Sequence, residues 1–411
     1  MSRINELIRK LCPNGVEYKK VWQITTWDKK YNSVDKYMQP KIIKYNYLLA
    51  NQLNEIIVDN GDVFILETGI NNTKKYTNED LAGDNLCNGE IIAIPWGGTP
   101  NVKYYNGKFV TGDNRIAVSN DINVLNTKFL YYIFENKMNE IADFYRGSGI
   151  KHPEMKKVLN LDIPVPPLEV QEEIVKILDK FGELEAELEA ELEARKSQYE
   201  FWRGKLLNND NLVIIGDLLE DKGYIRGPFG SALVKADMVF EGIPVYEQQH
   251  AIYNHRNFRY FISLDKAKKL ERFSINPNDL IISCSGTVGK VSVISDDDPK
   301  GIINQALLIL RLNKKLIMPK YMKYYLESPV GYRSITSNTN KSAQVNIANR
   351  EAIEKIKISV PSLEQQKHIV NILDKFDALV NDISEGLPAE IELRRKQYEY
   401  YRNKLLSFEE L

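Results

Sequence analysis

The chain has 411 residues, of which 43% are hydrophobic and 27% are charged. This composition is typical of a folded protein and excludes wholesale disorder, and the length predicts two or more domains. No apolar run approaches the ~20 residues that a membrane-spanning helix needs. The opening segment, MSRINELIRKLCPNG, lacks the apolar core of a signal peptide. We therefore expect a cytoplasmic protein without membrane contact.

Charge is distributed unevenly along the chain. The formal net charge is only -1, whereas a nucleic-acid-binding protein usually carries a basic excess. By segment, the net charge is +2 for residues 1–164, -6 for 165–210, +6 for 211–359 and -3 for 360–411. Any surface that binds nucleic acid is therefore expected in the two long, mildly basic segments.

The residues that most often bind metals or form disulfides show no organised pattern. Cys12, Cys87 and Cys284 are far apart and lack metal-ligand spacing, which predicts free thiols in a reducing compartment. None of the four histidines falls in a zinc-ligand pattern. We expect no metal site.

An internal repeat organises the chain. VPPLEVQEEIVKILDKF (165–181) and VPSLEQQKHIVNILDKF (360–376) are identical at most positions, at an offset of 195 residues. RKSQYEFWRGKLL (195–207) then matches RRKQYEYYRNKLL (394–406) at an offset of 199. The sequence is therefore an imperfect duplication, and the second copy has gained four residues between the two blocks.

Both copies of the repeat predict long helices, because apolar residues recur at spacings of three and four. The first copy should be unbroken, and its Glu-rich segment 183–193 is interpreted as a solvated face. A four-residue insertion is a stutter that keeps an apolar seam in phase. Gly386 and Pro388 lie in the insertion and are expected to kink or interrupt the second helix.

The predicted helices are too long to lie on a single domain. From Leu168 to Leu207 a straight helix would extend about 60 Å, more than the width of a domain of ~150 residues. Two such helices with leucine-rich seams are expected to pack as an antiparallel coiled-coil pair.

The two long segments share one order of elements. Short apolar runs alternate with turn residues and predict β-strands, and each segment then carries a Tyr-rich helix, at 127–138 and 319–330. The predicted fold class is α+β: two globular mixed α/β domains separated by the two long helices, with a pseudo-twofold repeat. The predicted boundaries are a domain at 1–164, a helix at 165–210, a domain at 211–359 and a helix at 360–411.

A basic, polar stretch precedes each long helix, at 144–157 and at 337–350. Guanidinium and amide groups match phosphates and base edges, so these loops are candidates for DNA contact. Their candidate side chains are Arg146, Lys151, His152, Lys341, Gln344 and Asn346.

Catalytic motifs are missing from the sequence. A DNA methyltransferase would need a Gly-rich cofactor turn and an aromatic-flanked Pro-Pro loop, and neither occurs. CSGTVGKV (284–291) fails as a phosphate-binding loop because Cys284 and Val291 stand at its ends. The acidic DDDPK (296–300) is interpreted as a hairpin turn and not as a metal-dependent nuclease centre. We expect no catalytic residues.

On the repeated blocks the sequence resembles the specificity subunit of type I restriction-modification systems. GYIRGPFGSAL (223–233), IPVYEQQHA (243–251) and SGTVGKV (285–291) are similar to segments of that family's target recognition domains. The resemblance implies a non-catalytic subunit whose two domains each read one half of a bipartite site in double-stranded DNA, with the helices setting the gap. It also implies two methyltransferase subunits that carry S-adenosylmethionine, and restriction subunits that join them; this chain itself would hold no cofactor.

By this resemblance, the Gly-rich turns and neighbouring loops of each domain would face the DNA. The predicted DNA-binding residues are Trp96, Thr99, Asn101, Arg115 and Lys151 in the first domain, and Arg226, Ser231, Gln248, Gln249, Lys290, Lys341 and Gln344 in the second. If the insertion adds one helical turn of about 5.4 Å to the second helix, the gap between half-sites should grow by about one base pair.

Two other functions stay open at this point. The chain could be a single-chain DNA methyltransferase or nuclease, which binding of S-adenosylmethionine or cleavage of DNA by the purified chain would reveal. It could also be a scaffold whose helices recruit proteins and whose domains bind something other than DNA.

Overall fold

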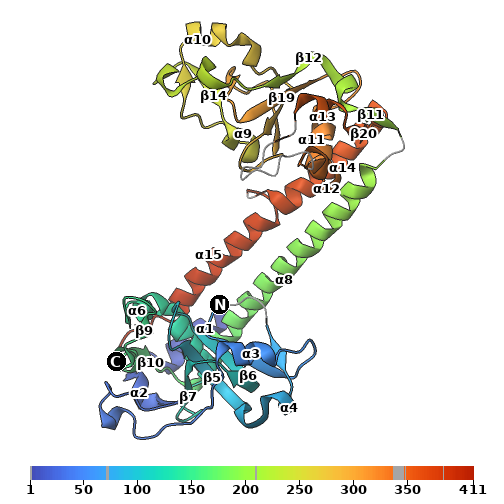
Figure 1. Cartoon of the computed structure of the whole chain (residues 1–411). Coiled ribbons are helices and arrows are strands. Elements are labelled where there is room, and N and C mark those ends of the chain that lie inside the picture. The colour runs from blue at the N-terminus through green and yellow to red at the C-terminus, as the bar shows by residue number, and fades with distance from the viewer. Residues whose placement is uncertain (1, 71–73, 209–210, 337–346, 348, 383) are drawn as a thin grey trace. The chain divides into compact units, whose positions relative to one another are not determined.

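A computed structural model of the chain divides into two compact units (Figure 1). Unit 1 comprises Met1–Glu187 and Ile391–Leu411, and unit 2 comprises Leu188–Glu390. The units differ from the four segments expected from the sequence, because each combines one globular domain with parts of both helical repeats. The structure describes residues 2–70, 74–208, 211–336, 347, 349–382 and 384–411.

Unit 1 is built on a six-stranded mixed sheet. Its strand order is β2-β7-β5-β6-β3-β4, and only the β3–β6 pair is parallel. The strands are β2 (Thr25–Trp27), β3 (Val63–Leu66), β4 (Tyr76–Thr77), β5 (Cys87–Pro95), β6 (Lys103–Thr111) and β7 (Asn114–Ser119). The helices of its globular part are α1 (Ser2–Leu11), α2 (Val21–Ile24), α3 (Ala50–Glu55), α4 (Glu79–Ala82), α5 (Thr127–Asn136), α6 (Met138–Ala142) and α7 (Met155–Leu159).

Unit 2 contains two four-stranded sheets. Their strand orders are β12-β19-β16-β17, which is antiparallel, and β13-β15-β14-β18, in which β14 and β18 are parallel. The strands are β12 (Leu219–Arg226), β13 (Met238–Val239), β14 (Ile243–Tyr246), β15 (Phe261–Ile262), β16 (Leu280–Ser283), β17 (Val291–Val293), β18 (Ile302–Ile303) and β19 (Leu307–Leu312). The helices of its globular part are α9 (Gln248–Ile252), α10 (Leu264–Lys269), α11 (Pro319–Glu327), α12 (Pro329–Thr336) and α13 (Arg350–Glu354).

The prediction of two mixed α/β domains is confirmed. Each domain is closed by a short antiparallel pair that joins its first strand to its last. In unit 1, β1 (Tyr18–Lys20) pairs with β10 (Asp162–Pro164), and in unit 2, β11 (Leu212–Ile214) pairs with β20 (Lys357–Ser359). A further small pair in unit 1 joins β8 (Tyr145–Arg146) and β9 (His152–Pro153).

In unit 1, a buried glutamine joins the globular domain to the long helix. The side chain of Gln171 is 0% exposed. Its Nε2 donates to the carbonyl oxygens of Val124 (2.8 Å) and Pro166 (2.7 Å), and its Oε1 accepts from the backbone N–H of Asn126 (2.9 Å). Asn126 in turn caps α5, because its side chain accepts from the first N–H groups of that helix. The start of the long helix and the start of α5 are therefore fixed to each other.

Unit 2 repeats this arrangement with Gln366, which is also 0% exposed. Its Nε2 donates to the carbonyl oxygens of Leu316 (3.1 Å) and Pro361 (2.8 Å), and its Oε1 accepts from the N–H of Met318 (2.8 Å). Met318 is the N-cap of α11, which begins with Pro319. The duplication seen in the sequence thus extends to individual hydrogen bonds.

A second repeated contact lies two turns further along each helix. Asp179 accepts from the Tyr132 hydroxyl (2.5 Å) and from Lys128 Nζ (2.7 Å) in unit 1. In unit 2, Asp374 accepts in the same way from Tyr324 (2.7 Å) and Lys320 (2.8 Å). Burial, followed by the neighbouring carboxylate, raises the pKa of both tyrosines, so they stay protonated hydrogen-bond donors at neutral pH.

The long helices pack antiparallel within unit 1. α8 (Leu168–Leu206) is unbroken, as expected (Figure 1), and its first half packs against α15 (Leu387–Leu405). The ring of Phe181 lies 6.3 Å from that of Tyr398 and 5.5 Å from that of Tyr401, measured between centroids. In unit 2 the rings of Tyr199 and Phe376 are 6.1 Å apart.

The second helical repeat is interrupted, as Gly386 and Pro388 predicted. α14 (Leu363–Asn381) ends before α15 begins at Leu387. A Cβ on Gly386 would lie 2.5 Å from the carbonyl oxygen of Ala378, so only glycine fits at this close approach. The expectation that the insertion adds one helical turn is wrong, because the chain leaves the helical conformation at the insertion.

Among the described residues, none of the helices combines the length and the apolar character that a membrane-spanning helix needs.

Replacing Gln171 by leucine is expected to destabilise unit 1 strongly. The change leaves one backbone N–H and two carbonyl groups without their partner in the interior, and each such group costs ~1–3 kcal/mol. We expect a loss of about 2–4 kcal/mol. Urea unfolding followed by tryptophan fluorescence measures it, since three of the four tryptophans, Trp22, Trp27 and Trp96, belong to unit 1.

Gln397→Leu, on α15 within unit 1, is the matched control. Its amide accepts a hydrogen bond from the side chain of Arg394 (3.2 Å), so the cost should stay at about 1 kcal/mol or less. Equal losses for the two variants would show that the buried amide does not join the domain to the helix.

Candidate nucleic-acid interface

In unit 1, two turns bring four of the five predicted residues together. The turn 96–101 follows β5, and the turn 146–152 packs against it. A Cβ on Gly97 would lie 2.8 Å from Ile150 Cγ2, and Gly98, at φ +103°, donates its N–H to the carbonyl of Lys151 (3.1 Å). Only glycines allow this approach. The structure therefore places Trp96, Thr99, Asn101 and Lys151 in one cluster, in which Thr99 and Lys151 are exposed.

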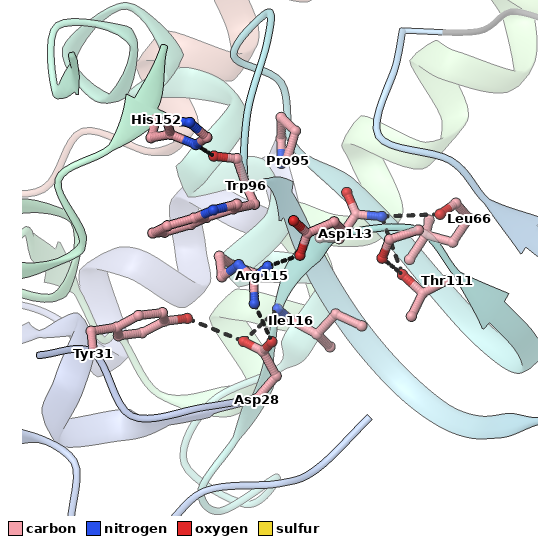
Figure 2. A network of polar contacts seen from close by, with 12 residues as sticks. Asp28, Tyr31, Leu66, Pro95, Trp96, Thr111, Asp113, Arg115, Ile116 and His152 are labelled. Carbon is pink, nitrogen blue, oxygen red and sulfur yellow. Dashed lines mark hydrogen bonds and ion pairs between the residues drawn. The ribbon is translucent and has the colours of Figure 1, made fainter. Parts of the chain in front are cut away.

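Trp96 is held between other polar and aromatic groups (Figure 2). The Nδ1 of His152 donates to its carbonyl oxygen (2.7 Å), and the His152 ring lies 5.2 Å from the indole. Tyr31 stacks on the indole with an interplanar angle of 12°. The guanidinium of Arg115 lies 4.8 Å from the indole centroid, which is a cation–π distance. The indole is thus fixed in place before any ligand binds.

Arg115 is the exception among the predicted residues. Its side chain is 1% exposed and forms ion pairs with Asp28 (2.9 Å) and Asp113. Asp28 also accepts from the Tyr31 hydroxyl (3.1 Å) and from the N–H of Ile116 (3.2 Å). Burial and this carboxylate raise the pKa of Tyr31 well above its usual value. The prediction that Arg115 contacts DNA is therefore wrong. Its guanidinium is buried, is neutralised by the two carboxylates and supports Trp96.

The far end of the same turn is also fixed. Asn101 Nδ2 donates to the carbonyl oxygens of Thr99 (2.9 Å) and Thr68 (3.2 Å). Nearby, Lys103 Nζ donates to the carbonyl oxygen of Glu67 (2.6 Å). Burial lowers the pKa of Lys103 to about 8, against the opposing effect of the Glu67 carboxylate.

In unit 2, one predicted cluster follows β12. Arg226 ends this strand, and its guanidinium lies 5.6 Å from the ring centroid of the exposed Phe229. Ser231 is exposed in the next turn. Burial raises the pKa of Cys284 to about 12, while the nearby Arg226 guanidinium opposes this shift. Arg226 therefore lies between the interior thiol and the exposed turn.

Gln248 and Gln249 line a recess of about 400 Å³. Gln248 donates to the carbonyl oxygen of Ser285, and Gln249 donates to the Glu247 carboxylate (3.3 Å). Arg259 pairs with Glu247 through two hydrogen bonds of 2.8 and 2.9 Å. The recess is lined by Glu247, Gln248, Gln249, Ile252, Tyr253, Arg259, Asn304 and Ala306.

Lys290 lies at the end of the tight turn that carries SGTVGK. The Ser283 hydroxyl closes this turn, because it donates to the carbonyl of Thr287 (2.6 Å) and accepts from the N–H of Lys290 (3.0 Å). The Lys290 side chain is exposed. The next residue, Val291, donates its N–H to the Glu327 carboxylate (3.0 Å). Burial raises the pKa of Glu327, and the charges of Lys323 and Lys290 oppose this shift.

Four predicted residues in unit 2, Arg226, Gln248, Gln249 and Lys290, extend from these turns and from α9. Lys341 and Gln344 lie outside the described residues. Sequence reasoning missed the Glu247–Arg259 pair, since a spacing of twelve residues carries no periodic signal. Across the described part of the chain, no group of three or more His, Cys, Asp or Glu side chains is arranged to hold a metal ion.

Arg115→Met is expected to destabilise unit 1 by about 3–5 kcal/mol, because it leaves the Asp28 carboxylate buried without its cation. Urea unfolding measures the loss. Arg146→Met is the control, since Arg146 forms an exposed pair with Glu154 (3.5 Å) and a hydrogen bond to the carbonyl oxygen of the adjacent Tyr145 (3.2 Å), for which a cost of about 1 kcal/mol is expected. If Arg115→Met proved as stable as Arg146→Met, the buried ion pairs would not support Trp96.

Lys103 predicts a pH dependence of stability. Its folded pKa is about 8 and its ordinary pKa is 10.5, so between these values the unfolded chain binds more protons than the folded chain. The free energy of unfolding should therefore rise with pH across this window. The difference between wild type and Lys103→Met isolates this contribution, as measured by urea unfolding at pH 7.5, 9 and 10.5. A difference that is flat or falls with pH would contradict the buried position of Lys103.

Comparison with known proteins agrees with this arrangement. The family model for the type I restriction modification DNA specificity domain matches twice, at residues 27–194 and 230–393. A putative type I restriction enzyme specificity subunit of Haemophilus influenzae is 33% identical over 334 residues, which cover 78% of this chain and 83% of the relative. A type I restriction enzyme specificity subunit of Escherichia coli is 31% identical over 309 residues, covering 72% of this chain and 74% of the relative.

Solved structures show the same fold. The S subunit of a type I restriction-modification system from M. genitalium aligns with a TM-score of 0.58 at 15% identity, covering 96% of this chain and 97% of that one. A chain from a structural study of assembly of the type I system aligns at 0.59 with 14% identity, covering 96% and 98%. On the two family matches and the identity to its relatives, the chain belongs to the family of type I restriction-modification specificity subunits.

Proposed function

We propose that this chain is the non-catalytic, sequence-specific DNA-binding subunit of a type I restriction-modification complex. The proposal rests on one observation: the same contacts attach both domains to their long helices, whereas the exposed loops of the two domains differ. Gln171 and Gln366 make the same three hydrogen bonds, and Asp179 and Asp374 bind the same pair of side-chain types. A protein that reads two different half-sites needs this combination of repeated support and unlike contact surfaces.

Each unit supplies one reader. In unit 1 the reader is the turn cluster around Trp96, and in unit 2 it is the recess and turns around Gln248 and Lys290. Exposed lysines suit phosphates, while amide and hydroxyl groups suit base edges. The near-neutral net charge of the chain favours a complex in which partner subunits supply much of the contact to the DNA backbone.

The helices are proposed to set the gap between half-sites and to bind two methyltransferase subunits. Phe201 and Tyr400 occupy equivalent positions of the repeat and are 64% and 59% exposed. An exposed aromatic surface that occurs twice suits a partner that binds in two copies. Restriction subunits would join this assembly. S-adenosylmethionine would bind to the methyltransferase subunits and not to this chain, and the complex would act in the cytoplasm.

The two alternative functions make different demands. A single-chain methyltransferase or nuclease would need a cofactor or metal site in this chain. A scaffold that does not bind DNA would have no use for Gln and Lys side chains on rigid turns in both domains. Binding of S-adenosylmethionine to the purified chain, measured by isothermal titration calorimetry, would favour the enzyme. Our proposal expects no heat of binding.

A domain exchange tests the proposal directly. Residues 211–359 would be replaced by the corresponding domain of another specificity subunit, and the variant assembled with its methyltransferase subunits. Single-molecule sequencing of the methylated DNA should show that one half of the motif changes while the other half and the gap stay the same. A motif that stays whole, or one that changes in both halves, would overturn the assignment of one half-site to each domain.

A further inference from the structure

The recess in unit 2 has a defined chemical character. Glu247 forms one wall, and its side chain is only 9% exposed, whereas that of Arg259 is 65% exposed. The two hydrogen bonds between them neutralise the carboxylate. The recess is therefore not an acidic site for a cation, and its lining presents the two glutamine amides beside the exposed Arg259 guanidinium.

Both glutamine amides are oriented by a fixed acceptor of the protein. The Nε2 of Gln248 faces the carbonyl oxygen of Ser285, and the Nε2 of Gln249 faces the Glu247 carboxylate. Each of these partners can only accept, so each amide must turn its nitrogen toward the protein. Each amide then presents its Oε1 and the second hydrogen of its Nε2 outward. Within the described residues, no donor is recorded for either oxygen.

Each amide offers the recess an acceptor beside a donor, and the acceptor requires a hydrogen-bond donor on the base. In the major groove, adenine offers its N6 amine and cytosine its N4 amine, whereas guanine O6 and thymine O4 are acceptors. An acceptor placed against either amide oxygen would repel it and leave both groups unpaired. The two Oε1 atoms therefore suit a base with an exocyclic amine, and the adjoining Nε2 hydrogen can meet the N7 of adenine.

We propose that Gln248 and Gln249 determine specificity in the second half-site by reading an exocyclic amine of adenine or cytosine. This inference rests on the proposed function. Arg259 acts as a positioning residue, because it holds the Glu247 carboxylate that orients Gln249.

The test uses the full chain assembled with its methyltransferase subunits. Competition binding measures the affinity of the complex for a series of DNA duplexes. In each duplex, one adenine of the second half-site is replaced by purine, or one cytosine by 2-pyrimidinone, so that only the exocyclic amine is lost. At one position the loss should weaken binding by wild type about tenfold. A purine effect identifies adenine as the base that is read, and a 2-pyrimidinone effect identifies cytosine.

Variants then connect that base to the recess. Gln249→Met or Gln248→Met should weaken binding to the natural duplex by about tenfold but bind the analogue as well as the natural base, because the contact is already absent. Gln305→Met is the matched control, since Gln305 is exposed beside the recess but does not line it. It should keep the wild-type ratio between natural and analogue duplexes.

Three results would overturn the inference. In the first, no amine deletion in the second half-site weakens binding by the wild-type complex. In the second, the Gln248 and Gln249 variants keep the wild-type ratio of binding between natural and analogue duplexes. In the third, the Gln305 control loses this ratio to the same extent as those variants. The wild-type scan requires no variant to fold, and unchanged recognition of the first half-site verifies that each variant assembles. Failure of the proposed function is distinguishable, since the wild-type complex would then prefer no sequence at all.

Discussion

The structure depends on one repeated interaction, the buried amide that joins each globular domain to a long helix. Gln171 and Gln366 use the oxygen and both N–H groups of the amide within the protein interior, where an unmade hydrogen bond is costly. Each amide also fixes the start of a domain helix, α5 or α11. A reader attached in this way cannot tilt on its helix without losing several hydrogen bonds, so the direction of its loops is set by the helix.

Rigid support continues from these amides toward the proposed reading surfaces. In unit 1 the buried Arg115 and its two carboxylates hold the plane of Trp96, and in unit 2 the Arg259–Glu247 pair orients Gln249. Charges are thus used in two ways within one domain type. Paired charges position a neighbouring side chain, while exposed lysines and the outward groups of the amides are proposed to contact phosphates and bases. On the proposed function, this division would let a chain of nearly neutral net charge read DNA selectively.

Much of the architecture could be predicted from the sequence because it rests on local patterns. The repeated blocks and their spacing of apolar residues predicted both helices, and Gly386 with Pro388 predicted the interruption. Whether the four inserted residues also add a helical turn could not be predicted, since an added turn and a break both shift the second block by four residues. Arg115 was misplaced for a different reason: its burial depends on Asp28, 87 residues away, and no local pattern reports such a partner. The loop contacts made by glycine, such as Gly97 against Ile150, were equally invisible.

The central claim is that each domain reads its own half-site. Directed cleavage by an iron chelate attached to a single cysteine tests it most directly. Thr99→Cys in unit 1 and Ser231→Cys in unit 2 offer exposed attachment points, while native Cys12 and Cys284 are buried and Cys87 is partly buried. In the assembled complex, we expect two separate cleavage patches, one at each half of the methylated motif. Coincident patches, or a patch that lies outside both halves, would contradict it.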